Sequence, residues 1–454
     1  MQASIAARQA PDTAQCVRQT VCNKELCAPV CVPGTVEIDT WAVSSLNFQR
    51  HLQRDLPLTH YQLPGTHNAY QTLSSGIGVE EHALHQLFVA AGYRDDHVVL
   101  QHQRYSVSDQ LRMGLRWIEF DMWRFSGQED SIRLCHDPAP DPRLLMWVEN
   151  AENKTGTQLK WDSANLGCFS AHTKNLATGL KEIAAWLSLP ENNQEIIVLY
   201  YDVKSPFVQD QVKQAINTTT QIFGDRIFSQ AEKESLGRWP TANELINAGK
   251  QVIVESNSDS FKDSEIIFYP KLTDEKNGGD QFTAEKFTPF PHCAIKGIPN
   301  RYGQEFFRAL DHSVAKGPAL QPDPDKMINV QDIRNFVNCG VSTMALDQVQ
   351  PSYIAEMIWS WDVNEPTAWG CAVMNAKGRW YSEPDCQQAK KHACVHHANR
   401  LDWKISTTAG TWNNASCPDH YQFAYPRTGY ENALLTQKLG NQEIWLAFEN
   451  PTDR

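Results

Sequence analysis

The sequence lacks the features of membrane-spanning and nucleic-acid-binding proteins. It has no run of about eighteen apolar residues, and its last ten residues, WLAFENPTDR, contain no lipid-anchor tail. The formal charge of −12 opposes attraction to nucleic acid or to an anionic bilayer, because both carry negative charge. We therefore expect neither a transmembrane segment nor a nucleic-acid partner.

Disorder and low complexity are also absent from the composition. Hydrophobic residues make up 41% and charged residues 21% of the 454, which is typical of a globular protein. The first fifteen residues contain no apolar signal-peptide core, so we expect that a leader was removed or replaced. The length predicts one large domain with a smaller module, and we expect a monomer.

Cysteines are plentiful, and eight of the twelve gather near the two ends of the chain. Zinc knuckles need Cys-x-x-Cys spacing, which the N-terminal group lacks, so we predict disulfides within each group. Three N-glycosylation sequons agree with an extracellular, secreted glycoprotein. The two cysteine groups and the sequons are Cys16, Cys22, Cys27 and Cys31; Cys371, Cys386, Cys394 and Cys417; and Asn153, Asn217 and Asn414.

Three regions follow from the pattern along the chain. Residues 1–40 are predicted to be a Cys-rich extension without a core of its own. Residues 41–365 alternate apolar runs with helical patterns, which predicts an α/β fold with a parallel sheet, either a (β/α)8 TIM-like barrel or a wound sheet. The predicted strands are 116–123, 195–203, 251–256 and 341–349, with a helix over 176–187 and a capping box at Thr241 and Glu244.

Residues 366–454 have a different composition, with Trp and Cys interleaved and no helical run. They are predicted to form a small, disulfide-bonded, β-rich module. Its Trp, Gly and Cys spacing loosely resembles that of C-type-lectin-like domains, which makes a glycan a possible ligand of this module.

Carboxylates and an amide suggest a metal site within the barrel region. Glu119 and Asp121 are two residues apart on a predicted strand, so both point to the same side. A divalent cation would relieve their repulsion, although either residue taken alone could equally face solvent or cap a helix. Asn68 and Asp202 add further oxygen ligands, and the set favours calcium, then magnesium, over zinc.

Two of the fifteen histidines are placed for acid–base chemistry. His67 follows a Pro-Gly turn and His136 follows an apolar run, where strands give way to loops. Two imidazoles flanking a phosphodiester can act as general base and general acid near neutral pH. His60 and His102 have comparable local settings, so neither candidate stands on its sequence position alone.

In combination, three motifs resemble the X region of phosphatidylinositol-specific phospholipase C. They read PGTHNAY, SVSDQLRMGLRWIEFDMW and LCHD, and the resemblance covers residues 57–140. It implies a secreted fungal or bacterial type of enzyme in which His67 is general base or phosphate-stabilising group and His136 is general acid. The calcium-dependent branch is implied, with the metal held by Asn68, Glu119, Asp121 and Asp202, and with substrate contacts at Arg116, Lys204 and Asp347.

The resemblance implies hydrolysis of a phospholipid at a membrane or micelle interface. The products would be diacylglycerol and a phosphorylated headgroup, from phosphatidylinositol or a related lipid. Two alternatives remain open: another metal-dependent phosphodiesterase, such as a glycerophosphodiesterase or a sphingomyelinase-like enzyme, and a glycan- or surface-binding protein with a relic barrel.

Overall fold

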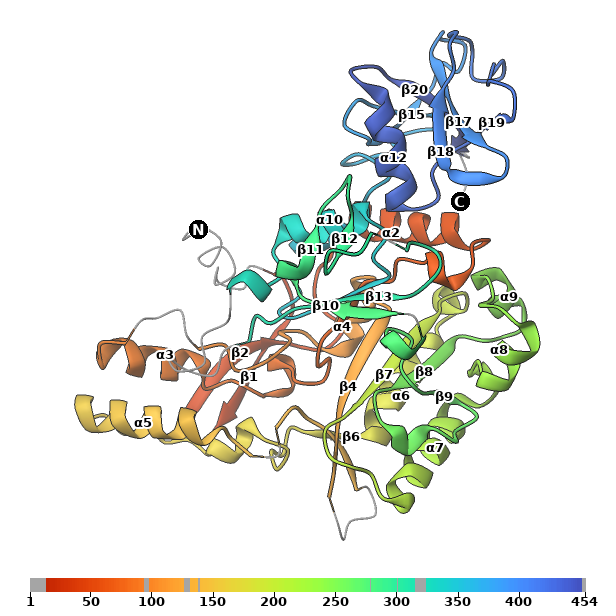
Figure 1. The fold of residues 1–454 in the computed structure, drawn as a ribbon. Coiled ribbons are helices and arrows are strands. Elements are labelled where there is room, and N and C mark those ends of the chain that lie inside the picture. The colour runs from red at the N-terminus through yellow and green to blue at the C-terminus, as the bar shows by residue number, and fades with distance from the viewer. Residues whose placement is uncertain are drawn as a thin grey trace.

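The computed structural model describes residues 14–93, 98–125, 131–137, 139–277, 279–299, 301–314 and 324–450. They form a barrel-like parallel sheet, a short N-terminal hairpin and a separate C-terminal sheet (Figure 1). No helix within these ranges is both long and apolar enough to cross a bilayer.

Eight parallel strands form the central sheet. Their neighbours follow chain order around a barrel, except that no pairing joins β9 to β10 among the described residues. The predicted α/β barrel is therefore confirmed, as a barrel open at one seam. The strands are β3 (Gly65–Thr66), β4 (Trp117–Arg124), β7 (Ile197–Val203), β8 (Val252–Ser256), β9 (Ile267–Phe268), β10 (Asp280–Phe282), β13 (Phe307–Leu310) and β14 (Thr343–Leu346).

The longest strands have the composition of a sheet that is covered on both faces. The first six residues of both β4 and β7 are buried without interruption. All four strands predicted from the sequence are present, with ends that coincide or differ by at most three residues. Two short antiparallel strands, β5 (Ile132–Leu134) and β6 (Lys174–Asn175), extend the sheet beside the end of β4.

Helices pack around the sheet. The predicted helix over 176–187 has those bounds: the Asn175 side chain caps it, and the chain turns away before Pro190. The capping box at Thr241 and Glu244 is present as well. The helices of the barrel region are α2 (Thr40–Gln53), α3 (Glu81–Ala90), α4 (Val107–Arg112), α5 (Pro142–Thr155), α6 (Leu176–Leu187), α7 (Gln209–Phe223), α8 (Gln230–Leu236), α9 (Ala242–Asn247), α10 (Val330–Asn338) and α11 (Pro351–Met357).

The N-terminal extension is a hairpin of β1 (Arg18–Asn23) and β2 (Leu26–Cys31) closed by two disulfides. It is held on the barrel region by the Asn23 side chain, which donates to Glu80 and to the Asp162 carbonyl. All twelve cysteines form disulfides, which confirms the predicted pairing within each terminal group. The pairs are 16–31, 22–27, 135–168, 293–339, 371–386 and 394–417.

The C-terminal region is β-rich, as predicted, but it also contains a helix. Here α12 (Gly429–Leu439) begins where the Thr428 side chain accepts from the Glu431 backbone. The expectation of no helical run was therefore wrong, because this helix buries polar as well as apolar residues and so lacks a clear apolar stripe. The strands are β15 (Gly370–Met374), β16 (Trp380–Glu383), β17 (Lys391–His396), β18 (Asn399–Ile405), β19 (Tyr421–Phe423) and β20 (Ile444–Asn450); a separate hairpin in the barrel region joins β11 (Phe287–Thr288) to β12 (Ala294–Ile295).

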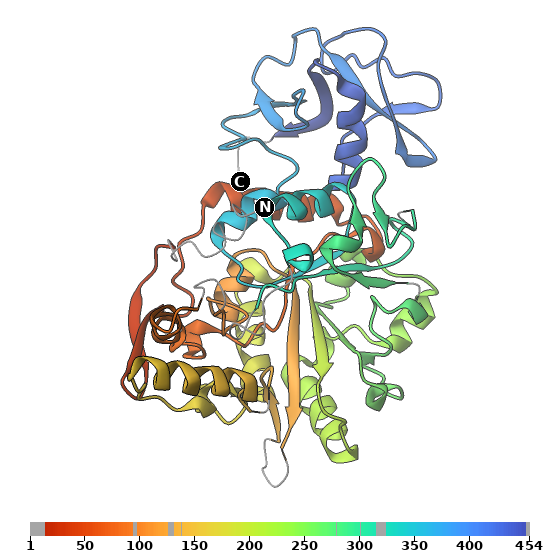
Figure 2. The same ribbon diagram turned by 60° about the vertical axis from the view of Figure 1, so that its left-hand side comes forward.

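Aromatic residues hold the C-terminal sheet to the barrel region. Phe48 of α2 contacts Trp380 and Phe448, with ring centroids 5.9 and 5.0 Å apart. The helices α2, α10 and α12 meet at this junction (Figure 2). Trp380, Trp403 and Trp445 of the module are buried, so these tryptophans belong to its core rather than to a glycan-binding surface.

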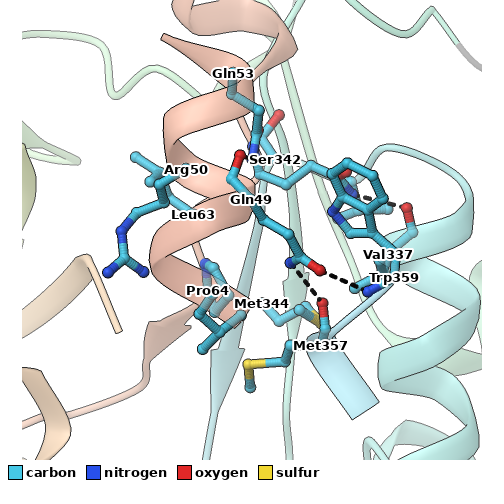
Figure 3. Close-up of a pocket in the computed structure, with 13 residues that line it drawn as sticks. Gln49, Arg50, Gln53, Leu63, Pro64, Val337, Ser342, Met344, Met357 and Trp359 are labelled. Carbon is cyan, nitrogen blue, oxygen red and sulfur yellow. Dashed lines mark hydrogen bonds between the residues drawn. The ribbon is translucent and has the colours of Figure 1, made fainter. Parts of the chain in front are cut away.

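A small cavity of about 20 Å³ lies between α2 and the starts of β3 and β14 (Figure 3). Gln49 donates to the Met357 carbonyl and accepts from the Trp359 backbone, which ties α2 to the segment after α11. The cavity lies at the amino ends of the strands. The candidate site described next is at the carboxyl ends.

Candidate active site

The polar groups named from the sequence converge at one end of the barrel. His67 and Asn68 follow β3, and Asp347 follows the neighbouring strand β14. Asp202 and Lys204 lie at the end of β7. Because the carboxyl ends of parallel strands meet at one edge, segments far apart in the chain share this site.

Strand β4 contributes two carboxylates from within its length. Glu119 and Asp121 are its third and fifth residues, so both point to the same side, as predicted. In the register with β7, Asp121 lies directly opposite Asp202. Ligand oxygens of the three acids all lie within 4.8 Å of one another. The structure therefore contains an acidic group able to hold a metal ion.

Two basic side chains neutralise much of this acidic cluster. The Lys204 ammonium lies 2.5 Å from Asp202 and 3.2 Å from Asp121. Arg308, on β13, donates to Glu119 in a fully buried ion pair. Burial raises the pKa of Asp121 above its usual range, as do Glu119 and Asp202, although Lys204 opposes them.

Asn68 connects the acids to the histidines. Its backbone has a positive φ of 47°, a conformation in which Asn is enriched. One amide atom lies 2.7 Å from both carboxylate oxygens of Asp121, and the other lies 3.2 Å from both ring nitrogens of His102. If the nitrogen faces Asp121, it donates to that carboxylate. If the oxygen faces Asp121, three oxygens converge, and only a cation makes their contact favourable.

Asp347 binds two imidazoles through one oxygen. Its Oδ1 lies 3.1 Å from Nδ1 of His67 and 2.8 Å from Nδ1 of His102. Burial alone would raise the pKa of Asp347, but His67 and His102 hold it below its usual range. Because an ionised carboxylate only accepts hydrogen bonds, both Nδ1 atoms donate to it.

The two imidazoles differ in protonation. Burial alone would lower the pKa of His67, but Asp347, Glu119 and Asp121 together outweigh burial and raise this pKa to about 9. Burial lowers the pKa of His102 well below its usual range, against the attraction of Asp347. At neutral pH, and with no ion beside them, His67 is therefore a cation and His102 is neutral.

His136 stands on the other side of His102. It follows β5, which the Cys135–Asp121 backbone hydrogen bond fixes to β4. Its ring centroid lies 4.7 Å from that of His102, which in turn lies 4.9 Å from that of His67. The Nδ1 atom contacts Asp137 at 2.9 Å, and Nε2 lies 4.0 Å from Asp121. At 29% side-chain exposure, against 14% for His67, it is the more open of the two.

Arg116 does not join the site, although substrate contact was predicted for it. It precedes β4, at the amino end of the barrel, and is buried. Its guanidinium donates to Glu195 at 2.7 Å and to two backbone carbonyls, and stacks over Trp186. The substrate assignment is therefore corrected: every polar contact described for this side chain is internal, and strand β4 separates it from Asp121.

Two residues of the site were not named as candidates from the sequence. His102 lies on an irregular segment, where the sequence offers no strand or turn signal that separates it from other histidines. Arg308 belongs to a four-residue strand that was not predicted. An arginine within an otherwise apolar stretch, FFRAL, was the available signal, because a buried charge requires a partner.

A family model described as PI-PLC X 1 matches residues 150–314. Over this segment the chain is similar to the PI-PLC X family. The matched segment contains Asp202, Lys204 and Arg308, but it begins after the motifs at 57–140 from which the resemblance was first drawn. The two segments are therefore separate in the sequence, and the barrel brings their polar residues to one site.

Curated relatives cover much of the chain at low identity. An uncharacterized protein of Mycobacterium tuberculosis is 25% identical over 437 residues, which is 89% of this chain and 78% of that protein. Maintenance of telomere capping protein 6 of Saccharomyces cerevisiae is 19% identical over 279 residues, covering 52% of this chain and 47% of its own length.

Solved structures similar to this chain include two phospholipases C. The phosphatidylinositol-specific phospholipase C of Listeria monocytogenes has a TM-score of 0.42 and 14% identity, covering 69% of this chain and 97% of its own. The calcium-dependent phosphoinositol-specific phospholipase C of a Pseudomonas species has a TM-score of 0.33 and 14% identity, with coverage of 66% and 95%.

Proposed function

We propose that this protein is a phospholipase C. It hydrolyses the glycerol-side phosphodiester of phosphatidylinositol or a related phospholipid, releasing diacylglycerol and a phosphorylated headgroup. The observation that carries the proposal is the line of imidazoles His67, His102 and His136 beside the acidic cluster of Glu119, Asp121 and Asp202. A phosphodiester placed there has a proton-transfer group on each side.

The roles of the two outer histidines follow from their partners. Asp347 holds the Nδ1 proton of His67, so Nε2 is the atom left to meet the substrate. A protonated His67 stabilises a phosphoryl oxygen, and a deprotonated His67 takes the proton of the attacking hydroxyl. His136, the more exposed imidazole, donates a proton to the departing diacylglycerol oxygen.

The donor set at the acidic cluster fits a hard divalent cation. Every candidate ligand is an oxygen, and the amide of Asn68 faces both oxygens of Asp121. Asn68, Glu119, Asp121 and Asp202 would hold calcium, with magnesium less favoured. Bound there, the ion would polarise a phosphoryl oxygen and lower the pKa of the attacking hydroxyl.

Lys204 would compete with that cation, because its ammonium already bridges Asp121 and Asp202. When the ion is absent, Lys204 supplies the positive charge that this cluster requires. We therefore expect Lys204 to withdraw from the acids on metal binding and to contact the substrate phosphate instead.

An exposed phenylalanine beside His136 supports a lipid interface as the place of action. Phe169 is 65% exposed, and its ring centroid lies 5.0 Å from that of the half-buried Phe125, which follows β4. Cys168 joins this segment to Cys135, the residue before His136. An exposed phenylalanine can bury its ring in the headgroup boundary of a bilayer.

An extracellular location completes the proposal. The complete pairing of the cysteines is typical of an oxidising compartment, and the three sequon asparagines are exposed. We propose a secreted, monomeric glycoprotein. A glycan ligand for residues 366–454 stays a prediction, for which Trp369, at 41% exposure, is the exposed module tryptophan.

A headgroup panel tests the proposed function. Purified protein is incubated with vesicles containing phosphatidylinositol, phosphatidylcholine or sphingomyelin, with calcium or with excess EGTA, and both products are identified by mass spectrometry. We expect diacylglycerol and an inositol phosphate, with calcium required. Release of ceramide from sphingomyelin would favour a sphingomyelinase-like metal-dependent phosphodiesterase. Undiminished turnover in EGTA would mean that Lys204 serves in place of the metal.

A further inference from the structure

A second cluster of metal-ligand type lies beside the oxygen-rich one. It consists of His67, His102 and Asp347, whose candidate ligand atoms all lie within 4.8 Å of one another. The two Nδ1 atoms converge on a single oxygen of Asp347, at 3.1 and 2.8 Å. Two imidazoles from separate segments thus already point their Nδ1 atoms at one carboxylate oxygen, and all three ligand atoms lie close enough to share an ion.

We propose that this triad is a zinc-binding site, and that zinc bound there inhibits the enzyme. Zinc would displace the Nδ1 proton of cationic His67, whose Nε2 keeps its own proton, and neutral His102 would bind through Nδ1 after its single proton has moved to Nε2. Imidazole nitrogens with one carboxylate form a donor set that suits zinc, whereas the neighbouring oxygen-only cluster suits calcium. The two neighbouring clusters would thus bind different cations, zinc at the triad and calcium at the acids.

The distances are close to those of a tetrahedral site. With bonds of about 2.0–2.1 Å, tetrahedral ligands lie about 3.3 Å apart. The observed contacts of 3.1 and 2.8 Å need an expansion of only a few tenths of an ångström. Residues around Asp347 hold it in place: its second oxygen accepts from the Ser313 backbone at 3.2 Å, and its own backbone donates to Asp311. Such partners orient metal ligands.

Among the described residues, the other group of three metal ligands is the oxygen-only acidic cluster. All twelve cysteines are in disulfides, so the chain offers no thiolate. His396 and His420 are near each other on the surface of the C-terminal module, with ring centroids 6.4 Å apart. They form the natural control for adventitious binding.

The inhibitory part of this inference rests on the proposed function, because it requires His67 to be catalytic. The binding part does not, because it depends only on the three ligands. Cobalt(II) is a suitable probe for the binding part, since it occupies zinc sites and gives intense visible absorption when four-coordinate.

The experiment titrates cobalt(II) into the metal-stripped full-length protein in excess calcium, so that the oxygen cluster is filled. We expect intense visible bands at one equivalent, which zinc abolishes. His102→Asn should lose the bands, and the surface control His396→Asn/His420→Asn should keep them. His102→Cys, which restores a ligand as sulfur, should add a sulfur-to-cobalt charge-transfer band, so a folding defect in His102→Asn would not leave the question open.

Two outcomes would overturn the site: bands that persist in His102→Asn with no new band in His102→Cys, or bands that vanish in the surface control. In the activity arm, zinc should inhibit the wild-type protein, and added calcium should not relieve this inhibition. If the protein is inactive on every lipid, the cobalt titration still decides whether the triad binds zinc.

Discussion

Asp347 gives two neighbouring imidazoles different protonation states. Asp347, Glu119 and Asp121 together keep the pKa of His67 high, whereas burial keeps His102 neutral. This difference assigns a charged, substrate-facing role to His67. The ring of His102 is within contact distance of both outer imidazoles.

The acidic residues differ in the same way, because each has its own cation. Arg308 satisfies Glu119, while Asp121 and Asp202 share Lys204. A bound metal ion would therefore replace the positive charge of Lys204 beside Asp121 and Asp202. Glu119 contributes to a metal site only if Arg308 releases it or if one carboxylate oxygen serves both.

Asp202→Asn should raise the calcium concentration that gives half-maximal activity by about tenfold or more, because ligand charge sets calcium affinity. Lys204→Met should lower it, because the competing ammonium is gone. Both are measured by calcium titration of activity, with the exposed Asp210→Asn as the matched control. If Asp202→Asn instead abolishes the cooperative melting transition, its carboxylate serves folding rather than metal binding.

The sequence was sufficient to predict most of this site and insufficient for the rest, for a physical reason. His67, Asn68, Glu119 and Asp121 lie in strand-end motifs whose local pattern reveals their direction. Arg308 and His102 depend on long-range contacts, across 189 residues to Glu119 and 245 residues to Asp347. No local pattern records such contacts.

At the scale of elements, the two ends of β4 have separate tasks. Its carboxyl half presents Asp121 to the site, while Arg116, just before its start, pairs with Glu195 before β7. Burial alone would raise the pKa of Glu195, but Arg116 and Arg50 lower it to about 2. The pair thus joins the starts of two neighbouring strands at the amino-terminal end of the barrel.

The Arg116–Glu195 pair should stabilise the fold without serving catalysis. The folded pKa of Glu195 is lowered, so its stabilisation is present above about pH 4.5 and is lost as pH falls toward 2. Glu195→Gln should lower the free energy of unfolding at pH 7 by about 3–5 kcal/mol and remove most of this pH dependence.

The measurement is urea unfolding at pH 7 and pH 3, together with kcat/KM at a temperature where both proteins are folded. The exposed pair Arg238–Glu244 provides the control Glu244→Gln, which keeps the helix cap and should change stability little. A large loss of kcat in Glu195→Gln, with stability unchanged, would return Arg116 to a role in the site.

The prediction of elements succeeded where periodicity was strong. The helix at 176–187 and the strands β4 and β7 could be recognised because their apolar pattern extends over seven or more residues. Helix α12 was missed because it buries polar as well as apolar residues and so lacks a clear apolar stripe. Strands of two residues, such as β3 and β9, are defined by pairing alone and have no periodicity to detect.

At the scale of the molecule, disulfides secure the parts that cover little core. The N-terminal hairpin and the C-terminal module each contain two disulfides. A single bridge joins Cys135, after β5, to Cys168, and another joins Cys293, before β12, to Cys339 at the end of α10. The buried tryptophans of the module extend the barrel's aromatic packing through Phe48. The module therefore packs against α2 through these aromatic contacts, although its sheet is separate from that of the barrel.

The most direct test of the account compares leaving groups in two single variants, His67→Ala and His136→Ala. With the natural lipid, each should lose about a hundredfold to ten-thousandfold in turnover, and the double variant should be scarcely worse than the poorer single one. A lipid analogue with a leaving group of low pKa needs little protonation. It should rescue His136→Ala substantially and His67→Ala hardly at all. Equal rescue of both variants, or near-normal turnover of either on the natural lipid, would contradict the assignment of this histidine pair.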